Sequence, residues 1–323
     1  MSLPYDKSAA VVVFPAPALA QIADPSLRRW LAHGTLTKHE RPIELLQDVL
    51  ATLARPYPND GLAALRMWGQ TGDRPAVWIA AADPIYLEPR LDHLCLHALQ
   101  QDSLSAGEFG VLLDYLQARL AGQERYGFAR IGSRGYVRAE KAIKTSSSPA
   151  YVIDQQLPND YLPKGDQTGT YHALRGEVEM ALHDHDINIE RQAKGLPPMN
   201  SLWLWGGGFA PDKETQPHPP LYANDPLLKG YWHSKTGVVA DWPGSVADCL
   251  EASVAGFVAQ PMPNRDDSGD WVEQNLNELR SALNSNRLSA VTLLFGGRYQ
   301  LRLRKSDSWK FWRGASALFG EQE

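Results

Sequence analysis

The stretch LHDHDINIERQAKGLPPMNSLWLWGGG, residues 182–208, is the most informative part of this sequence. Apolar residues recur among polar ones over its first third, at a spacing that predicts one or two helical turns. Gly195 is expected to end that helix, and two prolines then force an extended course. Residues 201–205 follow as an apolar run of strand length. The three glycines at 206–208 predict a turn whose bare backbone can approach a ligand or a neighbouring helix closely.

The composition is that of an ordinary globular protein. At 323 residues the chain can enclose a sizeable core, in one large or two moderate domains. Apolar residues make up 43% of it and charged residues 21%. Its 32 Lys and Arg against 37 Asp and Glu give a net charge of −5. No polybasic stretch is evident, so we expect no nucleic-acid partner.

The first residues and the cysteines indicate a cytoplasmic protein. The opening MSLPYDKSAAVVVFPAPALA contains Asp6 and Lys7 and lacks a basic leader and a long apolar run. We therefore expect neither a signal peptide nor a membrane span. Cys95 and Cys249 lie far apart, without the spacing of a zinc or redox pair. Both are expected to be small buried hydrophobic residues.

Strand and helix patterns alternate along the chain, which predicts the α/β class. The expected strands are 9–14, 76–86, 94–98, 126–131, 135–138, 201–205, 237–240, 256–260, 290–295 and 299–304. The expected helices are 27–31, 42–53, 105–120 and 271–283. Ser105 and Glu108 are expected to form a capping box at the start of one of them.

The order of these elements predicts two parts. Residues 72–140 are expected to form a small α+β insertion in a larger α/β core made of 1–71 and 141–323. Residues 144–149 are expected to be a surface loop. The proline-rich residues 209–225 are long enough for a functional loop or a mobile lid.

The central stretch also carries a family resemblance. The pattern His-x-x-Asn-x-x-Arg-x-x-x-Gly-x-x-Pro-x-Asn, an apolar strand and Trp-Gly-x-Gly resemble the bacterial regulatory proteins of the RpfE type. The residues that carry the pattern are His185, Asn188, Arg191, Gly195, Pro198, Asn200, Trp205, Gly206 and Gly208. The resemblance covers most of the chain, including DPIYL at 83–87 and NDPLLKG at 224–230. It implies a regulatory or binding role.

Residues 177–230 are similar, more weakly, to the archaeal-type cofactor-independent phosphoglycerate mutases. This second resemblance implies an alkaline-phosphatase-like α/β fold that holds two metal ions, about 4 Å apart, with a hydroxyl nucleophile between them. Such ions require several carboxylates and imidazoles, commonly at the C-terminal ends of sheet strands.

The sequence departs from that metal-binding pattern at three places. After the first expected strand it reads Val-Phe-Pro-Ala-Pro at 13–17, where the enzymes have an acidic residue. The turn NRDDSGD at 264–270 has no histidine, where they have an aspartate followed by a histidine. Phe-Gly-Gly at 295–297 replaces an Asp-His pair. We therefore expect no metal ion, no other cofactor and no catalytic residue.

Isolated polar residues give weaker signals. Asp266, Asp267 and Asp270 could hold a divalent cation, but an acidic turn that caps the following helix explains them more simply. His183 and His185 are two residues apart, so on a helix they would face different directions. No Gly-x-Ser-x-Gly elbow or Walker-type phosphate loop is present.

Asn188, Arg191 and Asn200 permit two interpretations. On a helix the first two are neighbours on one face, and the following turn can bring Asn200 back towards them. The cluster can hydrogen-bond buried loop carbonyls, or it can hold a carboxylate or phosphate through Arg191. We favour the structural role. Trp203 and Trp205 share one strand face, where core packing is the default and a stacking platform for a ring is the alternative.

We therefore expect an alkaline-phosphatase-like or phosphoglycerate-mutase-like core with a regulatory or ligand-binding function and no catalysis. The expected partner is an anionic small molecule or a regulatory protein. The candidate ligand-binding residues are His185, Asn188, Arg191, Asn200, Trp205, Gly206, Gly207 and Gly208. One alternative is a phosphoglycerate mutase or phosphatase-like metalloenzyme. The other is a protein-interaction module that docks through the proline-rich loop and exposed tryptophans.

Overall fold

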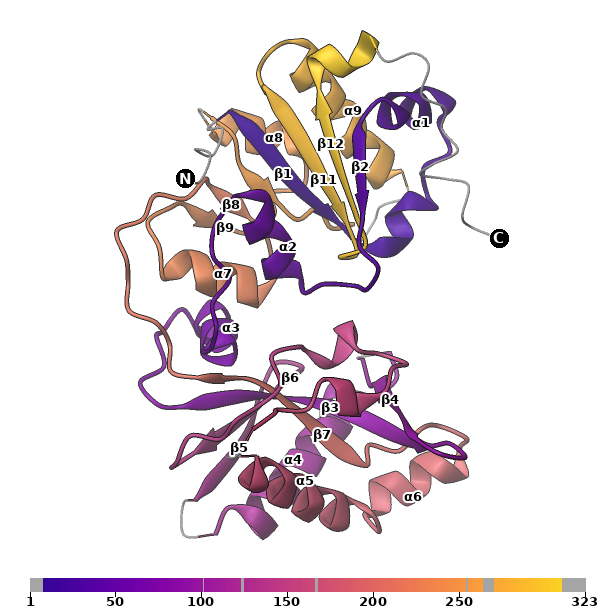
Figure 1. Ribbon diagram of the computed structural model, residues 1–323, viewed down its shortest axis with the longest axis vertical. Helices are drawn as coiled ribbons and strands as arrows, with labels where there is room; N and C mark the ends of the chain where they lie inside the picture. The colour runs from indigo at the N-terminus through magenta and orange to yellow at the C-terminus, as the bar shows by residue number, and fades with distance from the viewer. Residues whose placement is uncertain are drawn as a thin grey trace. The chain divides into compact units, whose positions relative to one another are not determined.

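A computed structural model describes residues 8–100, 102–122, 125–165, 168–253, 255–263 and 270–309. The chain divides into two compact units (Figure 1). The first unit consists of Met1–Tyr57 and Lys213–Glu323, and the second of Pro58–Asp212. Each unit contains its own sheet and its own helices, which confirms the expected α/β class. No helix in the described ranges is long and apolar enough to cross a membrane.

The sheet of the first unit is parallel at its centre. Its strands, in order across the sheet, are β2 (Thr35–Lys38), β12 (Tyr299–Arg304), β11 (Ala290–Phe295), β1 (Ala9–Phe14), β10 (Val258–Ala259), β8 (Leu221–Tyr222) and β9 (Val239–Ala240). All neighbours from β11 to β9 are parallel, whereas β12 is antiparallel to both β11 and β2. The carboxyl ends of β8, β10, β1 and β11 therefore meet at one edge of this sheet.

Helices bury the apolar side chains of this sheet. They are α1 (Pro25–Ala32), α2 (Leu45–Thr52), α7 (Pro226–His233), α8 (Val246–Ala252) and α9 (Trp271–Asn284). Val272, Leu276, Leu279 and Leu283 recur at helical spacing on α9, and they enter one core with β1, α1 and α8. β1 is a continuous apolar run because a parallel strand inside a sheet is covered on both faces.

The second unit is built on an antiparallel sheet around the long strand β3 (Ile79–Pro89). One edge of β3 pairs with β7 (Ser201–Gly208), and the other edge pairs first with β6 (Arg134–Ala139) and then with β4 (Leu94–Ala98). β5 (Tyr126–Ile131) completes a hairpin with β6. The strands expected at 76–86, 94–98, 126–131 and 135–138 are confirmed, and they form two hairpins.

The helices of the second unit are α3 (Leu62–Thr71), α4 (Ala106–Leu120), α5 (Gly169–Leu182) and α6 (Asp186–Ala193). α4 begins at Ser105 with the expected capping box to Glu108. Leu202 and Leu204 of β7 share a core with α4 and α5. Trp203 and Trp205 alternate with these leucines, so the two tryptophans lie on the opposite face of β7, as the sequence predicts.

The second unit extends beyond the predicted insertion 72–140 on both sides. β7 pairs with β3 over most of its length, and α3 and α5 pack against β7. Because this pairing joins segments more than a hundred residues apart, local sequence patterns do not reveal it. The patterns also do not predict α3, α5, α7, α8, β2 or β8.

Candidate functional site

The glycines Gly206, Gly207 and Gly208 lie inside β7 rather than in the turn that the sequence predicts. A Cβ atom on Gly206 would lie 2.8 Å from the Leu62 Cβ, and one on Gly208 only 2.3 Å from the Gly61 amide nitrogen. Gly206 also has a φ of +60°, which disfavours any side chain. The bare backbone therefore lets the start of α3 pack directly on β7. Of the two close approaches that the sequence allows, to a ligand or to a helix, the structure shows the approach to a helix.

The amides of these glycines already have partners within the protein. The Gly206 N–H donates to the Ser146 carbonyl at 2.8 Å, and the Gly207 N–H donates to the Thr145 hydroxyl at 2.8 Å. They join β7 to the segment 143–148, and a bound anion would have to use other donors.

Arg191 connects two loops and the start of α4 through its guanidinium. Its side chain is 3% exposed, and its guanidinium forms an ion pair with Glu108 at 3.0 Å and donates to the carbonyls of Pro197 and Ser103. These contacts use all three of its nitrogens, so none faces an open pocket. The ion pair between Arg191 and Glu108 also links α6 to the capping box of α4.

Asn188 and Asn200 bond to the backbone in the same manner. The Asn188 amide donates to the carbonyls of Leu182 and Met199, and its oxygen accepts from the Met199 N–H. Asn200 accepts from the Leu87 N–H at 2.7 Å and donates to the Leu87 carbonyl at 2.9 Å. Both asparagines replace missing backbone partners, which is the structural role that the sequence favours.

His185 and Trp205 also have partners within the fold. The His185 Nδ1 accepts from the Ile187 N–H and caps α6, and its ring packs edge-on against Tyr115. The Trp205 indole donates to the Asp83 carboxylate at 2.6 Å in a buried site. Arg66 completes that site with an ion pair to Asp83 at 3.0 Å, and its guanidinium lies over the Trp205 ring.

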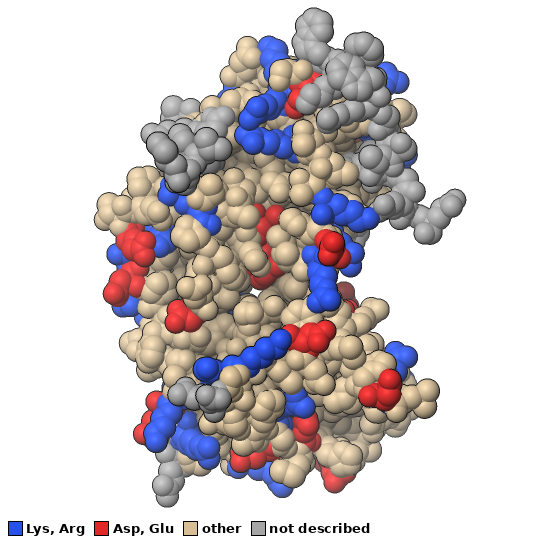
Figure 2. Space-filling view, viewed as in Figure 1, with Lys and Arg blue, Asp and Glu red and all other residues tan. Residues whose placement is uncertain are grey.

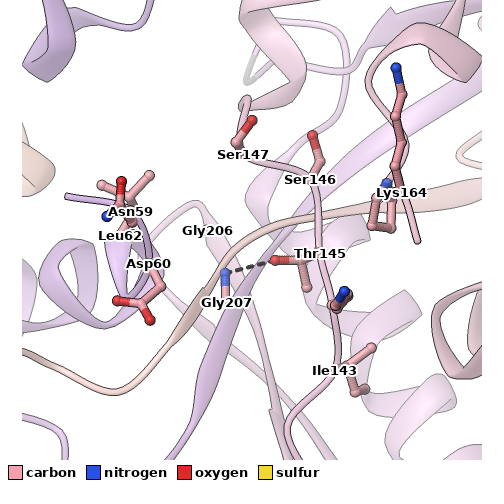
Figure 3. Close-up of a pocket in the computed structure, with 12 residues that line it drawn as sticks. Asn59, Asp60, Leu62, Ile143, Thr145, Ser146, Ser147, Lys164, Gly206 and Gly207 are labelled. Atoms are coloured by element: carbon pink, nitrogen blue, oxygen red, sulfur yellow. Dashed lines mark hydrogen bonds between the residues drawn. The ribbon is translucent and has the colours of Figure 1, made fainter. Parts of the chain in front are cut away.

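A pocket opens where β7 passes the start of α3, wholly within the second unit (Figure 3). Its volume is about 310 Å³. It is lined by Asn59, Asp60, Leu62, Ile143, Lys144, Thr145, Ser146, Ser147, Pro163, Lys164, Gly206 and Gly207. Of the eight candidate residues, only Gly206 and Gly207 line it, and they do so through their backbone.

The pocket is lined by two lysines and one aspartate. Lys144 and Lys164 are both exposed, and neither forms an ion pair or hydrogen bond with the described residues. The Lys144 Nζ lies 3.5 Å from where a Cβ on Gly165 would stand, so Lys144 lies beside the segment that carries Lys164. Asp60 stands across the pocket from Thr145 and Lys164 (Figure 3).

Serine and threonine hydroxyls lie between these charges. The Thr145 hydroxyl accepts from Gly207, so its own proton is free to be donated. Ser146 hydrogen-bonds to the Ser148 backbone, whereas Ser147 is exposed and its hydroxyl points away from Thr145 and Gly207 (Figure 3). The pocket thus offers two cations and two hydroxyl donors, opposed by one carboxylate.

The carboxyl edge of the first unit's sheet is where the phosphoglycerate-mutase resemblance implies metal ions. β1 ends there at Phe14, and β11 ends at Phe295. A Cβ on Gly296 would lie 2.5 Å from the Ala16 Cβ, and one on Gly297 only 2.3 Å from the Ile43 carbonyl oxygen. This backbone therefore has no room for ligating side chains at 296 and 297.

Several polar side chains at this edge hydrogen-bond to the backbone, and two of them cap helices. Asp225 accepts from the amides of Leu227 and Leu228, and Gln260 accepts from the Asp225 N–H. Glu44 accepts from the two amides that start α2. Among the described residues, the donors here do not fit a site for two metal ions.

Two buried carboxyls of α2 titrate abnormally. Burial, with a smaller contribution from the nearby Asp225, raises the pKa of Glu44 to about 7, against the opposing effect of the amides that it caps. Burial also raises the pKa of Asp48 to about 6, against the opposing effect of His39. The Asp48 Oδ2 and the His39 Nε2 are buried without hydrogen-bond partners in the structure.

The weak metal candidates contribute little that the structure can place. Asp266 and Asp267 lie outside the described residues. Asp270 is exposed and stands at the start of α9, where its side chain makes no capping hydrogen bond. Charges of both signs are interspersed on the face shown in Figure 2, and the described residues there form no extended basic patch.

The chain is distantly similar to cofactor-independent phosphoglycerate mutases. It is 29% identical over 114 residues to the 2,3-bisphosphoglycerate-independent phosphoglycerate mutase of Methanosarcina acetivorans, covering 35% of this chain and 29% of the relative. It is 26% identical over 136 residues to the enzyme of that name from Methanosarcina mazei, covering 41% and 34%. The matches thus span about a third of these relatives, and no protein-family model matches the chain.

Two solved structures align along most of the chain. The cofactor-independent phosphoglycerate mutase of Thermoplasma acidophilum covers 92% of this chain and 90% of its own, at 18% identity and a TM-score of 0.42. The PH0037 protein of Pyrococcus horikoshii covers 93% of this chain and 88% of its own, at 11% identity and a TM-score of 0.47.

Sequence reasoning treats the main polar residues of the pocket only as loops. Lys144 to Ser147 belong to the predicted surface loop 144–149, and no strand or helix is predicted around Lys164. The one available signal is the run Lys-Thr-Ser-Ser-Ser, which combines a cation with hydroxyls. Nothing local shows that this run lies beside Gly206.

Proposed function

We propose that this protein is a non-catalytic regulatory protein that binds a small phosphorylated or carboxylated anion in the pocket between β7 and α3. The observation that carries the proposal is that Lys144 and Lys164 both line that pocket and have no partners among the described residues. Two ammonium groups beside hydroxyl donors suit an oxyanion, because each can donate to it and offset its charge.

The opposite wall narrows the class of ligand. Asp60 would repel a second anionic group but can accept a hydrogen bond from a hydroxyl. The pocket therefore favours a ligand that carries an anionic group at one end and a hydroxyl at the other. A phosphorylated hydroxy acid has this pattern.

The absence of turnover is supported by the carboxyl edge of the first unit's sheet. Phosphoryl transfer depends on charge neutralisation and in-line positioning, which two metal ions supply together. The carboxylates of Glu44 and Asp225 at that edge cap helices, and 296–297 has no room for ligands. The resemblance to RpfE-type proteins supports a regulatory role for a protein that lacks such a metal site.

The binding test uses 3-phosphoglycerate, 2-phosphoglycerate and inorganic phosphate as probes in isothermal titration calorimetry. We expect one site per chain, and Lys144→Ala with Lys164→Ala to weaken binding at least about tenfold, equivalent to ~1.4 kcal/mol. Lys194→Ala is the matched control, because Lys194 is exposed on the second unit but pairs with Glu190. Undiminished affinity in the double variant would remove the pocket from the proposal.

The activity test separates this proposal from the metalloenzyme alternative. We expect no interconversion of 3-phosphoglycerate and 2-phosphoglycerate in the presence of Mn²⁺, Mg²⁺ or Co²⁺. Mutase turnover that follows the protein through purification and disappears with chelator would establish the enzyme instead.

A further inference from the structure

The hairpin of β3 and β4 places three metal-ligating side chains on one face. Glu88 stands directly opposite Cys95, and Tyr86 opposite His97. Leu87 and Leu96 form the pair between them, and their side chains are buried on the other face. Because strand side chains alternate, Glu88, Cys95 and His97 must share the half-buried face.

The three side chains are close enough to bind one ion. A carboxylate oxygen, the thiol sulfur and an imidazole nitrogen all lie within 4.8 Å of one another. The His97 Nε2 lies 2.8 Å from the Glu88 Oε2, and Cys95 is a free thiol. Among the described residues, no other three His, Cys, Asp or Glu side chains come this close to one another.

The hairpin holds these ligands in place. The outer edge of β4 is bonded to 154–156, through Leu96 to Gln156 and through the Ala98 N–H to the Asp154 carboxylate. The His97 ring stacks on Tyr86, with ring centroids 5.8 Å apart. Strand positions of this kind fix a site more accurately than loop positions do.

The chemistry of the donors selects the metal. A thiolate and an imidazole favour a borderline-soft ion, and a carboxylate adds a second negative charge, which together suit Zn²⁺. Arg90 lies 2.7 Å from the Glu88 Oε2, the oxygen that also contacts the His97 ring, so Arg90 orients this carboxylate towards the cluster.

We propose that Glu88, Cys95 and His97 bind one Zn²⁺ ion, with water in a fourth, tetrahedral position. Binding deprotonates the Cys95 thiol and replaces the hydrogen bond between His97 and Glu88 by bonds from each to the ion. The site is independent of the proposed anion pocket, with which it shares no residue.

Cobalt substitution tests the site directly. We expect Co²⁺ to bind the full-length protein with one equivalent showing thiolate-to-cobalt charge transfer, and Zn²⁺ to displace it. Cys95→Ser should abolish the charge-transfer band, and His97→Ala should weaken Co²⁺ binding at least about tenfold. His93→Ala is the matched control on the same hairpin and should leave both unchanged, since His93 pairs with Asp92.

Alkylation of the wild-type thiols gives a second measurement that needs no variant. Zn²⁺ should slow the modification of Cys95 by iodoacetamide, which mass spectrometry can follow over time. The buried Cys249 is the internal reference, and Zn²⁺ should not change its rate of modification. The proposal is overturned if Cys95 is not protected, if wild-type protein shows no charge transfer, or if Cys95→Ser retains the band.

Discussion

Single side chains in this protein substitute for backbone hydrogen bonds. Asn200 pairs with both the N–H and the carbonyl of Leu87, as a strand residue would, and Asn188 does the same for Met199. Arg191 joins two loops to α4 through one buried guanidinium. The residues that carry the resemblance to regulatory proteins therefore also hold the loop between α6 and β7.

Asn200→Ala should destabilise the protein by about 1–3 kcal/mol, because it leaves the Leu87 N–H and carbonyl without partners. Urea denaturation would show this as a lower midpoint. Asn277→Ala provides the control, since Asn277 is exposed on α9 and should have little effect. An unchanged midpoint for Asn200→Ala would contradict the structural role.

At the scale of elements, close packing decides which residues each segment can contain. α3 crosses β7 so closely that Gly206 and Gly208 have no room for a Cβ. The turn between β11 and β12 meets Ala16 and Ile43 in the same way at 296–297. α2 starts on a buried carboxylate, Glu44, which caps two of its amides.

That buried cap predicts a pH dependence. The folded-state pKa of Glu44 is about 7, above the ordinary 4.5, so the folded state holds a proton that the unfolded state releases. Its contribution to stability is complete below pH 4.5 and declines as the pH rises towards 7, by roughly 3 kcal/mol. Glu44→Gln should flatten this part of the stability profile, measured by denaturation across that range. A profile that keeps its full slope in the variant would refute the assignment to Glu44.

At the scale of the whole molecule, the two units differ in how the chain forms them. The second unit is one continuous segment, Pro58–Asp212, with its own core, whereas the first requires segments from both ends of the chain. Both proposed sites lie on the second unit.

The segment 58–212, expressed alone, should therefore fold cooperatively. Circular dichroism and a single urea transition would show it, and 213–323 alone should not fold because it lacks the central strand β1. A molten 58–212 segment, without a cooperative transition, would contradict this expectation.

The sequence by itself determined the elements whose signals are local. The strands at 9–14, 290–295 and 299–304 and the Ser105 capping box appear as predicted, because strand propensity and capping depend on neighbouring residues. The face shared by Trp203 and Trp205 follows from alternation alone.

Only the tertiary structure decided what lies beside these elements. It placed β7 against β3, moved three glycines from a predicted turn into a strand, and brought Lys144 and Lys164 to one pocket. It also set Glu88 opposite Cys95 through the register of a hairpin. Such juxtapositions depend on long-range pairing and packing, which the local sequence of either partner does not encode.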